Sequence, residues 1–575
     1  MESGRFVFVL FLIAAAVLGC GTGGPSSPPS PSGEPSTAPS PSRTLHLLIR
    51  AEPVSLAAKP LEGTGVSIRS ATRPFNATLD INDGREQVRP YLAEALPQVN
   101  TDTWRVFPDG RMETTYRLRP NLTWHDGTPL EAEDFAFAWR VYTTPELGLA
   151  ATKPQSLMEE VVAPDARTVV IRWRQLYADA SALTETFQAL PRHILESAYL
   201  QGTSESFINH PFWNKEYVGL GPYRLERWEP GAFIEGVAFD KHVWGRPRVE
   251  RLTVRFIPDE NAALANLLSG SVHLVSDRSI RFEQGTVLRR EWAANNGGVV
   301  LLTPTMGRYT HLQFRPELAS PAGILDVRVR RALAHGIDKQ ALNDGLFEGI
   351  GVMTASLIRH SVPYYADIDR AVAKYPYDPR RTEQLMTDAG YTRGADGVYV
   401  SAAGERFSPQ LMNQAGVQPE RETTIMVDTW RRLGIDAQPY IVPVARSRDD
   451  ENRATFPAMQ TASGSGVYEA ELQFLTSAQI GSPQTRWRGG NRGGWANADF
   501  DRGWEGYNTI LETTERNRQV VEMERLITEQ LPVIPLLFNF AVSAYLTTIQ
   551  GADAGVVNDV LVTWNIHEWE LLPAR

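Results

Sequence analysis

The stretch YRLRPNLTWHDGTPL, residues 116–130, joins a predicted strand to a predicted helix. From Met112 to Leu118 successive side chains alternate between two sides, as they do on a β-strand. A turn follows, in which Gly127 tolerates a positive φ. Residues 131–142 then form a helix whose first turn is acidic, where the helix dipole favours negative charge. The stretch therefore predicts a strand, a tight turn and a helix in close succession.

Similar elements recur along the chain in both directions from this stretch. Short apolar runs predict strands, and amphipathic segments that end at Gly or Pro predict helices. Because the two kinds of element intermix throughout, we predict an α/β architecture. The predicted strands are 45–49, 169–171 and 251–256, and the predicted helices are 260–268, 327–334, 338–346, 380–389, 425–433 and 516–530.

The N-terminal sequence predicts an export signal. Residues 6–18 form an apolar run that is shorter than the roughly 20 residues of a membrane span. The run ends in Val-Leu-Gly-Cys, which resembles a bacterial lipobox, so we expect residues 1–19 to be a signal peptide and Cys20 to carry a lipid. Residues 20–43 are rich in Pro and Ser, as in a semi-rigid tether. The alternative is an ordinary secretory signal with an incidental Cys.

Composition narrows the class of function. Hydrophobic residues make up 42% and charged residues 22% of the chain, as in globular proteins with a substantial core. The net charge of −10 and the absence of a basic run argue against nucleic acid. Cys20 is the only cysteine and the ten His are scattered, so we predict no metal site. No sequence motif of a hydrolase or a nucleotide-binding loop is present, so we predict neither a catalytic residue nor a cofactor.

Six segments, beginning with the opening stretch, resemble the landmarks of the bacterial family 5 solute-binding proteins. These are the extracytoplasmic receptors of peptide, nickel and related ABC importers. The segments come in the family's order and cover nearly the whole chain after the tether. They are residues 116–130 with Asp134, Gly219–Tyr223, Phe239–Gly245, Asp259–Leu274, Val327–Lys339 and Tyr377–Tyr391.

The resemblance implies a two-lobed fold like that of the type II periplasmic binding proteins, with an extra subdomain in the first lobe. The ligand would lie in a cleft between the lobes. Lobe 1 would comprise residues 44–302 and a return segment, 538–575, and lobe 2 would comprise residues 303–537. The two crossings between the lobes would form a hinge, and ligand binding would favour the closed form.

Site residues in this family come from loops that face the cleft. Glu52 is a candidate in lobe 1. The candidates in lobe 2 are Ser463, Ser465, Tyr468 and Glu469. Peptide-binding relatives often carry a Gly-Trp-x-x-Asp pattern in this second segment, and both the Trp and the Asp are missing here. Glu469 would substitute for the Asp, or it is an ordinary exposed loop residue.

A glycine-rich loop, residues 486–495, supplies further ligand-binding candidates: Arg486, Trp487 and Trp495. Arginine offers a planar fork for carboxylate or phosphate, and tryptophan offers a face for stacking. An anionic or sugar-like ligand would suit this loop. The alternative is an exposed loop with Trp495 anchored in the core.

The expected function is that of a monomeric receptor, anchored to the extracytoplasmic side of the cell membrane by its lipid alone. It would deliver a peptide or another small polar solute to the permease subunits of an ABC importer. Two alternatives remain: a sensing or structural lipoprotein with the same fold, and an exported hydrolase. The sequence does not identify the ligand.

The glycine-rich loop gives a direct test. If it contacts the ligand, Arg486→Ala or Trp487→Ala weakens ligand binding and leaves the thermal unfolding temperature nearly unchanged. Calorimetric titration of the ligand into each variant measures the effect. An unchanged affinity would remove this loop from the site.

Overall fold

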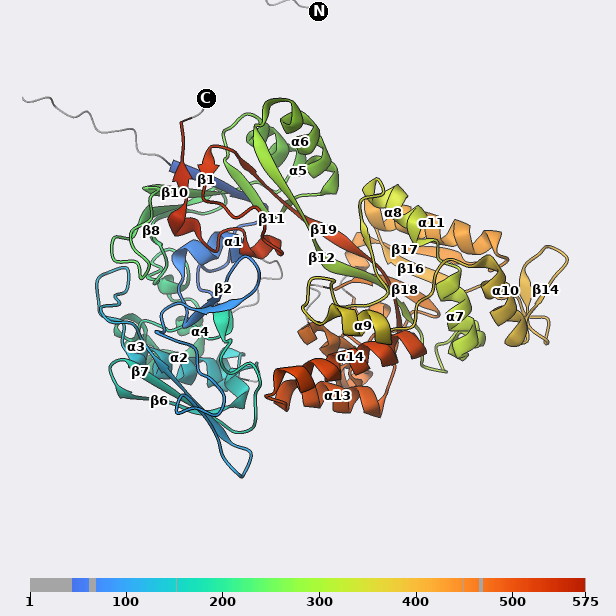
Figure 1. The fold of residues 1–575 in the computed structure, drawn as a ribbon, viewed down its shortest axis with the longest axis horizontal. Coiled ribbons are helices and arrows are strands. Elements are labelled where there is room, and N and C mark those ends of the chain that lie inside the picture. The colour runs from blue at the N-terminus through green and yellow to red at the C-terminus, as the bar shows by residue number, and fades with distance from the viewer. Residues whose placement is uncertain (1–43, 62–68, 151, 448, 465–468, 574–575) are drawn as a thin grey trace, which may run out of the picture. The chain divides into compact units, whose positions relative to one another are not determined.

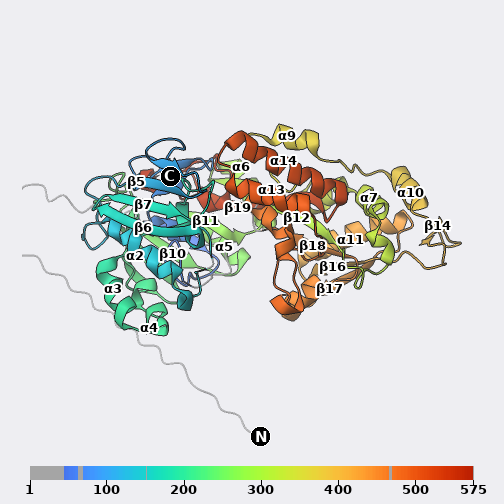
Figure 2. The same cartoon turned by 90° about the horizontal axis from the view of Figure 1, so that it is seen from below.

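The computed structural model describes residues 44–61, 69–150, 152–447, 449–464 and 469–573. Residues 43–575 form one compact unit (Figure 1, and turned by 90° in Figure 2). The predicted signal segment, the whole tether with Cys20, and the candidates Ser465 and Tyr468 lie outside the described residues. Among the described residues no helix is both long and apolar enough to cross a membrane.

Two long antiparallel strands, β12 (Gly298–Leu312) and β19 (Val533–Leu546), lie next to each other in an 11-stranded sheet (Figure 1). β19 reads VIPLLFNFAVSAYL, an almost continuous apolar run of the kind found in strands that are buried on both faces. The other strands of this sheet are β17 (Gln438–Val442), β16 (Gln410–Gln414) and β18 (Met459–Ser463) beside β12; β11 (Leu274–Ile280), β1 (Thr44–Ile49), β10 (Arg251–Phe256), β9 (Phe233–Ala238) and β8 (Tyr223–Glu229) beyond β19; and β13 (Val352–Met353), which also pairs with β19.

The largest apolar clusters divide along these two strands. One gathers residues that precede β12 or follow β19, such as Phe135 and Trp569. Another gathers mainly residues between the two strands, such as Leu333 and Trp430. We call the corresponding parts lobe 1 and lobe 2; in Figure 1 lobe 1 combines blue-to-green segments with the red C-terminal segment. The predicted lobe boundaries fall inside β12 and β19, which both lobes share, and they stay a prediction.

Helices and smaller sheets complete the two lobes. The helices of lobe 1 are α1 (Arg69–Thr72), α2 (Ala132–Thr143), α3 (Arg192–Gln201), α4 (Ser204–Ile208), α5 (Glu260–Leu268) and α6 (Phe282–Asn295). The helices of lobe 2 are α7 (Val327–His335), α8 (Lys339–Phe347), α9 (Tyr365–Ala371), α10 (Pro379–Asp388), α11 (Val417–Arg432), α12 (Asp450–Ala454), α13 (Ala498–Thr509) and α14 (Thr513–Gln530). The smaller sheets are the four-stranded β4 (Trp104–Val106), β5 (Met112–Arg117), β7 (Thr168–Trp173) and β6 (Met158–Asp165), and the pairs β2 (Asp80–Asn82) with β3 (Val88–Pro90), β14 (Thr392–Arg393) with β15 (Tyr399–Val400), and β20 (Ile549–Gln550) with β21 (Glu570–Leu571).

The large sheet is covered on both faces within lobe 1. Val275 and Ala544 pack with residues of α5 and α6, whereas their neighbours Leu274 and Tyr545 pack into the main core of lobe 1. This alternation follows from the two-residue period of a strand. The face opposite α5 and α6 is therefore the one from which the site described below is built.

The opening stretch forms the predicted strand, turn and helix. It follows β5 into a turn where Gly127 has φ +92°. α2 then begins after Glu131, whose backbone N–H donates to the carboxylate of Asp134 at 3.0 Å. The indole of Trp124 donates to the same carboxylate at 3.2 Å, so the turn is tied to the helix that follows it.

The other landmark residues serve the scaffold. A side chain at Gly221 would put its Cβ 2.3 Å from the backbone nitrogen of Asn76, so the chain can pass there only as glycine. Tyr223 is buried and donates to the Val249 carbonyl at 3.1 Å. Trp244 packs on Tyr91, with ring centroids 4.2 Å apart.

Arg328 and Asp338, both in the fifth landmark segment, each stabilise the end of a helix and do not pair with each other. Asp338 caps α8 by accepting from the backbone N–H of Ala341 at 2.9 Å. Arg328 binds Asp326, the residue that caps its own helix. Both are therefore helix-end interactions inside lobe 2.

Two departures from the predicted elements affect the large sheet and lobe 2. α11 begins at Val417 rather than near 425, because Pro419 lies in its first turn, where a missing N–H costs no hydrogen bond. β12 and β19 were not predicted as strands at all. The apolar run of β19 was a usable signal for a buried strand.

A buried carboxylate in lobe 2 holds a loop of the same lobe. Glu524 of α14 is fully buried and accepts from the backbone N–H of Leu357 at 3.1 Å and 3.2 Å. No cation pairs with it among the described residues. Burial raises the pKa of Glu524 to about 7, so the folded state retains a proton that the unfolded chain releases at lower pH.

This raised pKa predicts a pH-dependent stability. Between pH 4.5 and 7 the folded state binds more protons at Glu524 than the unfolded state, so the free energy of unfolding falls as pH rises, by about 3 kcal/mol for this group alone. Glu524→Gln removes the titration and should flatten this part of the profile. Urea unfolding at several pH values measures it, with Glu522→Gln, an exposed site on the same helix, as the control. Equal slopes for both variants and the parent chain would contradict the assignment.

Candidate functional site

The two lobes meet directly at a buried ion pair. Arg359, in the loop after β13 of lobe 2, binds Glu86 in the turn between β2 and β3 of lobe 1, with one N–H···O distance of 2.9 Å. The carboxamide of Asn558 also donates to Glu86, at 3.1 Å. Arg359 is only 7% exposed, so this contact is shielded from solvent. It joins three segments that lie far apart in the sequence.

A second contact between the lobes involves α13 and α14. Arg516 binds Asp179 of lobe 1 at 2.7 Å and lies 4.1 Å from the centre of the Tyr507 ring. Nearby, Lys153 donates to the side chain of Asn508 at 3.1 Å. The facing walls of the lobes are therefore lined with charged and aromatic groups at both contacts.

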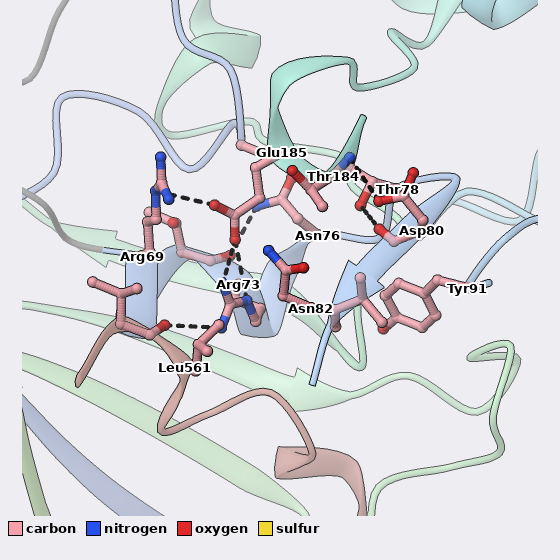
Figure 3. A pocket seen from close by; sticks show the side chains of 14 residues that line it. Arg69, Arg73, Asn76, Thr78, Asp80, Asn82, Tyr91, Thr184, Glu185 and Leu561 are labelled. Atoms are coloured by element: carbon pink, nitrogen blue, oxygen red, sulfur yellow. Dashed lines mark hydrogen bonds and ion pairs between the residues drawn. The ribbon is translucent and has the colours of Figure 1, made fainter. Parts of the chain in front are cut away.

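The wall of lobe 1 contains a cavity of about 50 Å³ between α1, the turn at Glu185 and η11 (Asp559–Leu561) (Figure 3). Glu185 binds Arg69 at 3.0 Å and the Nε of Arg73 at 3.1 Å. Burial alone would raise the pKa of Glu185, but the charges of Arg73 and Arg69 outweigh burial and hold this pKa below its ordinary value. The carboxylate therefore stays ionised in this cavity.

Two more buried carboxyl groups lie behind this wall. Asp277 accepts from the hydroxyl of Ser70 at 2.9 Å, and Asp559 begins η11. Burial and the neighbouring Asp559 raise the pKa of Asp277 to about 7. Burial likewise raises the pKa of Asp559, against the opposing charge of Arg278. Because two buried like charges repel, this pair holds a proton more readily than isolated Asp residues do.

The wall of lobe 2 presents a carboxylate in the second predicted site segment. Glu469, the first residue of η8 (Glu469–Leu475), accepts from the hydroxyl of Tyr364. The charge of Glu469 also helps to raise the pKa of the Arg516 guanidinium, so the two side chains interact electrostatically. Glu469 thus lies next to the α13–α14 contact between the lobes.

The other candidates of the cleft loops are separated. Glu52 accepts from the indole of Trp228 at 2.7 Å and from the backbone N–H of Gly231 at 2.9 Å, so its carboxylate is engaged with the β8–β9 hairpin of lobe 1. Ser463 ends β18 opposite Arg308 on β12 and is exposed. Glu469 and Ser463 flank the segment that contains Ser465 and Tyr468.

The glycine-rich loop is attached to the far end of β12. The backbone N–H of Phe314 donates to Gly493, whereas Gly464 donates to Gly307, nearer the middle of the strand. At about 3.4 Å per residue, these two attachment points, seven residues apart, are separated by about 24 Å along the strand direction. The loop and Ser463 are therefore attached to different parts of β12 and its continuation.

Within this loop the three candidates differ in exposure. Trp495 is 2% exposed, and its indole donates to Gln530 at 2.9 Å, so it lies in the core, as the alternative interpretation expected. Trp487 is half-buried, with the guanidinium of Arg315 5.9 Å from its ring centre. Arg486 is exposed, with φ +53°. Only Arg486 and Trp487 can offer surface to a ligand.

The chemistry of the facing walls suits binding rather than coordination of a metal by side chains. No group of three or more His, Cys, Asp or Glu that could hold a metal ion occurs among the described residues. The walls instead combine guanidinium groups, carboxylates and tyrosines. Such groups make charge-assisted hydrogen bonds to polar or zwitterionic molecules.

Sequence reasoning missed Arg359 and Glu86. The two residues are 273 positions apart, and neither belongs to a recognisable motif. Arg359 follows the apolar pair Leu357–Ile358 and Glu86 lies in a turn, so neither stands out in the sequence as a site residue. Only the pairing of β2 with β3 and of β13 with β19 brings them together.

Comparisons with known proteins agree with this architecture. The chain is 22% identical to the oligopeptide-binding protein AppA of Bacillus subtilis over 545 residues, 90% of this chain and 93% of the relative. It is 22% identical to heme-binding protein A of Haemophilus influenzae over 83% of each chain.

Solved structures show the same fold. The substrate-binding protein CtaP of Listeria monocytogenes superposes with a TM-score of 0.72 at 18% identity, over 92% of this chain and 99% of that one. NikZ of Campylobacter jejuni, solved with Ni(L-His), gives a TM-score of 0.69 at 19% identity over the same shares. The predicted two-lobed α/β fold is thereby confirmed. A family model, that of the bacterial extracellular solute-binding proteins, family 5 (middle part), matches residues 88–482, and the chain belongs to this family.

Proposed function

We propose that this protein is an extracytoplasmic receptor that captures a small polar solute between its lobes and delivers it to an ABC importer. The match of the family model over residues 88–482 carries the proposal. The fold supports it, because two lobes joined by long shared strands can separate and approach about those strands. Lobe 1 would comprise residues 44–302 and 538–575, and lobe 2 residues 303–537, with β12 and β19 as the hinge.

The ligand in this proposal is a peptide or a similar molecule that carries both charges. Lobe 2 offers an exposed cation, Arg486, and an anion, Glu469, and groups of opposite charge such as these can bind opposite ends of one molecule. The relatives whose names state a ligand bind oligopeptides, heme or a nickel–histidine complex.

The direct experiment is native mass spectrometry of the purified body, residues 44–575. We expect a bound small molecule that is released unchanged on denaturation and rebinds with a saturable heat in calorimetry. Conversion of that molecule into a product during incubation would instead indicate an enzyme. A body that carries no ligand from the host and binds none from a library of di- to pentapeptides would contradict the peptide proposal.

Attachment to the membrane through Cys20 is part of the proposal, and a receptor held near its permease works at a high local concentration. Cys20→Ala should leave the exported chain unlipidated and move it from the detergent phase to the aqueous phase in a phase-partition assay. Intact-mass measurement of the parent chain should show a diacylglyceryl group. An identical partition of parent and variant would rule out the anchor.

The Arg359–Glu86 pair predicts how the lobes respond to a single substitution. Glu86→Gln leaves the Arg359 guanidinium without its counter-charge, so the arrangement in which the lobes touch should lose about 1–3 kcal/mol. Small-angle X-ray scattering of the ligand-free body should then report a larger radius of gyration.

The matched control is Glu94→Gln, which breaks an exposed ion pair with Arg167 inside lobe 1. It should leave the radius of gyration unchanged. If Glu86→Gln also leaves it unchanged, the pair does not hold the lobes together.

A further inference from the structure

A cavity of about 220 Å³ lies beside the shared strands, on the α6 side of the sheet. We call it the hinge cavity. Arg50 and Arg281 line it from lobe 1, Gln418 lines it from lobe 2, and Asn539 lines it from β19. The carboxamide of Gln418 donates to that of Asn539 at 2.7 Å, which fixes the lobe 2 side of the cavity against the strand. The cavity therefore contains parts of both lobes.

Positive charge dominates the lining. Three arginines, Arg50, Arg278 and Arg281, face one glutamate, Glu283. Arg281 is already paired with Glu260, and the charge of Arg278 acts on the buried Asp559. The third guanidinium has no such carboxylate partner among the described residues.

That guanidinium belongs to Arg50. It makes no ion pair or side-chain hydrogen bond with any of the described residues. Burial, followed by the charges of Arg278 and Arg281, lowers the pKa of Arg50, against the weaker opposing charges of Glu260 and Asp277. A half-buried cation beside two others, with no anion of its own, is costly unless an anion from outside joins it.

Two helices begin at the cavity. α6 starts at Phe282 and α11 at Val417, beside Gln418, so the N-terminal ends of two helices of 14 and 16 residues add partial positive charge. Three phenylalanines form the apolar part of the wall: Phe282 stacks on Phe540 at 5.6 Å between ring centroids and meets the edge of Phe347 at 5.2 Å. The cavity thus offers a cationic end and an aromatic wall.

The hinge cavity is distinct from the contact between the lobes. Phe540 and Val542 of β19 line the cavity, and Val542 packs with α6. The Arg359–Glu86 pair lies instead beside Asn558, the residue that caps η11 on the other face of the sheet. Figure 1 shows α6 and α1 on opposite sides of the shared strands. A molecule in the hinge cavity would therefore leave the facing walls of the lobes free.

We propose that the hinge cavity is a second ligand site, which binds a small organic anion through Arg50 and packs its aromatic or aliphatic body against the phenylalanines. The recognised chemistry is a carboxylate or phosphate head on an apolar body. Since the lining belongs to both lobes, occupation of this site is linked to the arrangement of the lobes. The site does not depend on the solute that the receptor carries.

Phenyl phosphate is a suitable probe, because it joins a dianionic head to an aromatic ring. Calorimetric titration into the full body should give a saturable heat that weakens with added salt. Arg50→Gln should lower the affinity at least ~10-fold, because it removes a charge-assisted hydrogen bond. Gln418→Ala should lower it by a smaller factor, which would show that lobe 2 takes part.

The matched control is Arg289→Gln, which removes the same charge from an exposed position of α6 outside the cavity. It should bind phenyl phosphate like the parent chain. Thermal unfolding checks that Arg50→Gln folds, as expected for a residue without an internal partner. No saturable binding of phenyl phosphate, or equal affinities for the parent chain and Arg50→Gln, would overturn the proposal.

Discussion

The antiparallel pairing of β12 with β19 is the interaction on which the rest of the structure depends. It joins two segments more than 200 residues apart, and every other strand of the large sheet is attached to one side or the other of this pair. The lobes therefore share backbone hydrogen bonds instead of merely touching. Movement between them must bend or twist these two strands, whose register shifts at two bulges near Met306 and Tyr309. Bulges let a strand bend without loss of the whole ladder.

Charge near the site is arranged in two ways. Glu185 keeps its charge because Arg69 and Arg73 surround it, whereas Glu524 and Asp277 are buried without a direct cation partner and have pKa values near neutrality. A carboxylate paired with arginines stays ionised, whereas a buried carboxyl group without a cation partner takes up a proton as the pH falls. These buried carboxyl groups are therefore more sensitive to pH than the ion pairs on the outer surface, which solvent screens.

Much of the fold was predictable from local patterns. The opening stretch, α5, α8 and α10 follow from strand alternation, helical periodicity and glycine stops, which are all encoded within a few residues. β12 was not predicted as a strand, because polar and apolar residues are mixed over its 15 positions. The candidate site was harder to predict. Glu86 and Arg359 come together only through the tertiary fold, so no local pattern marks them as partners. The burial of Trp495 could not be predicted either, since a loop tryptophan has the same sequence pattern whether it is buried or exposed.

The place of β19 in the chain has a consequence for biosynthesis. Synthesis proceeds from the N-terminus, yet β11 of lobe 1 and β12 both take β19 as a neighbour, and β19 is made only after residue 532. Until then both lobes lack their shared strand, and two long strand edges stay open. The large sheet therefore stays incomplete while most of the chain is synthesised, and many contacts between residues far apart in the sequence have still to form. Residues from 533 onward thus complete the sheet that both lobes share, so both lobes can finish folding only after these residues have been made.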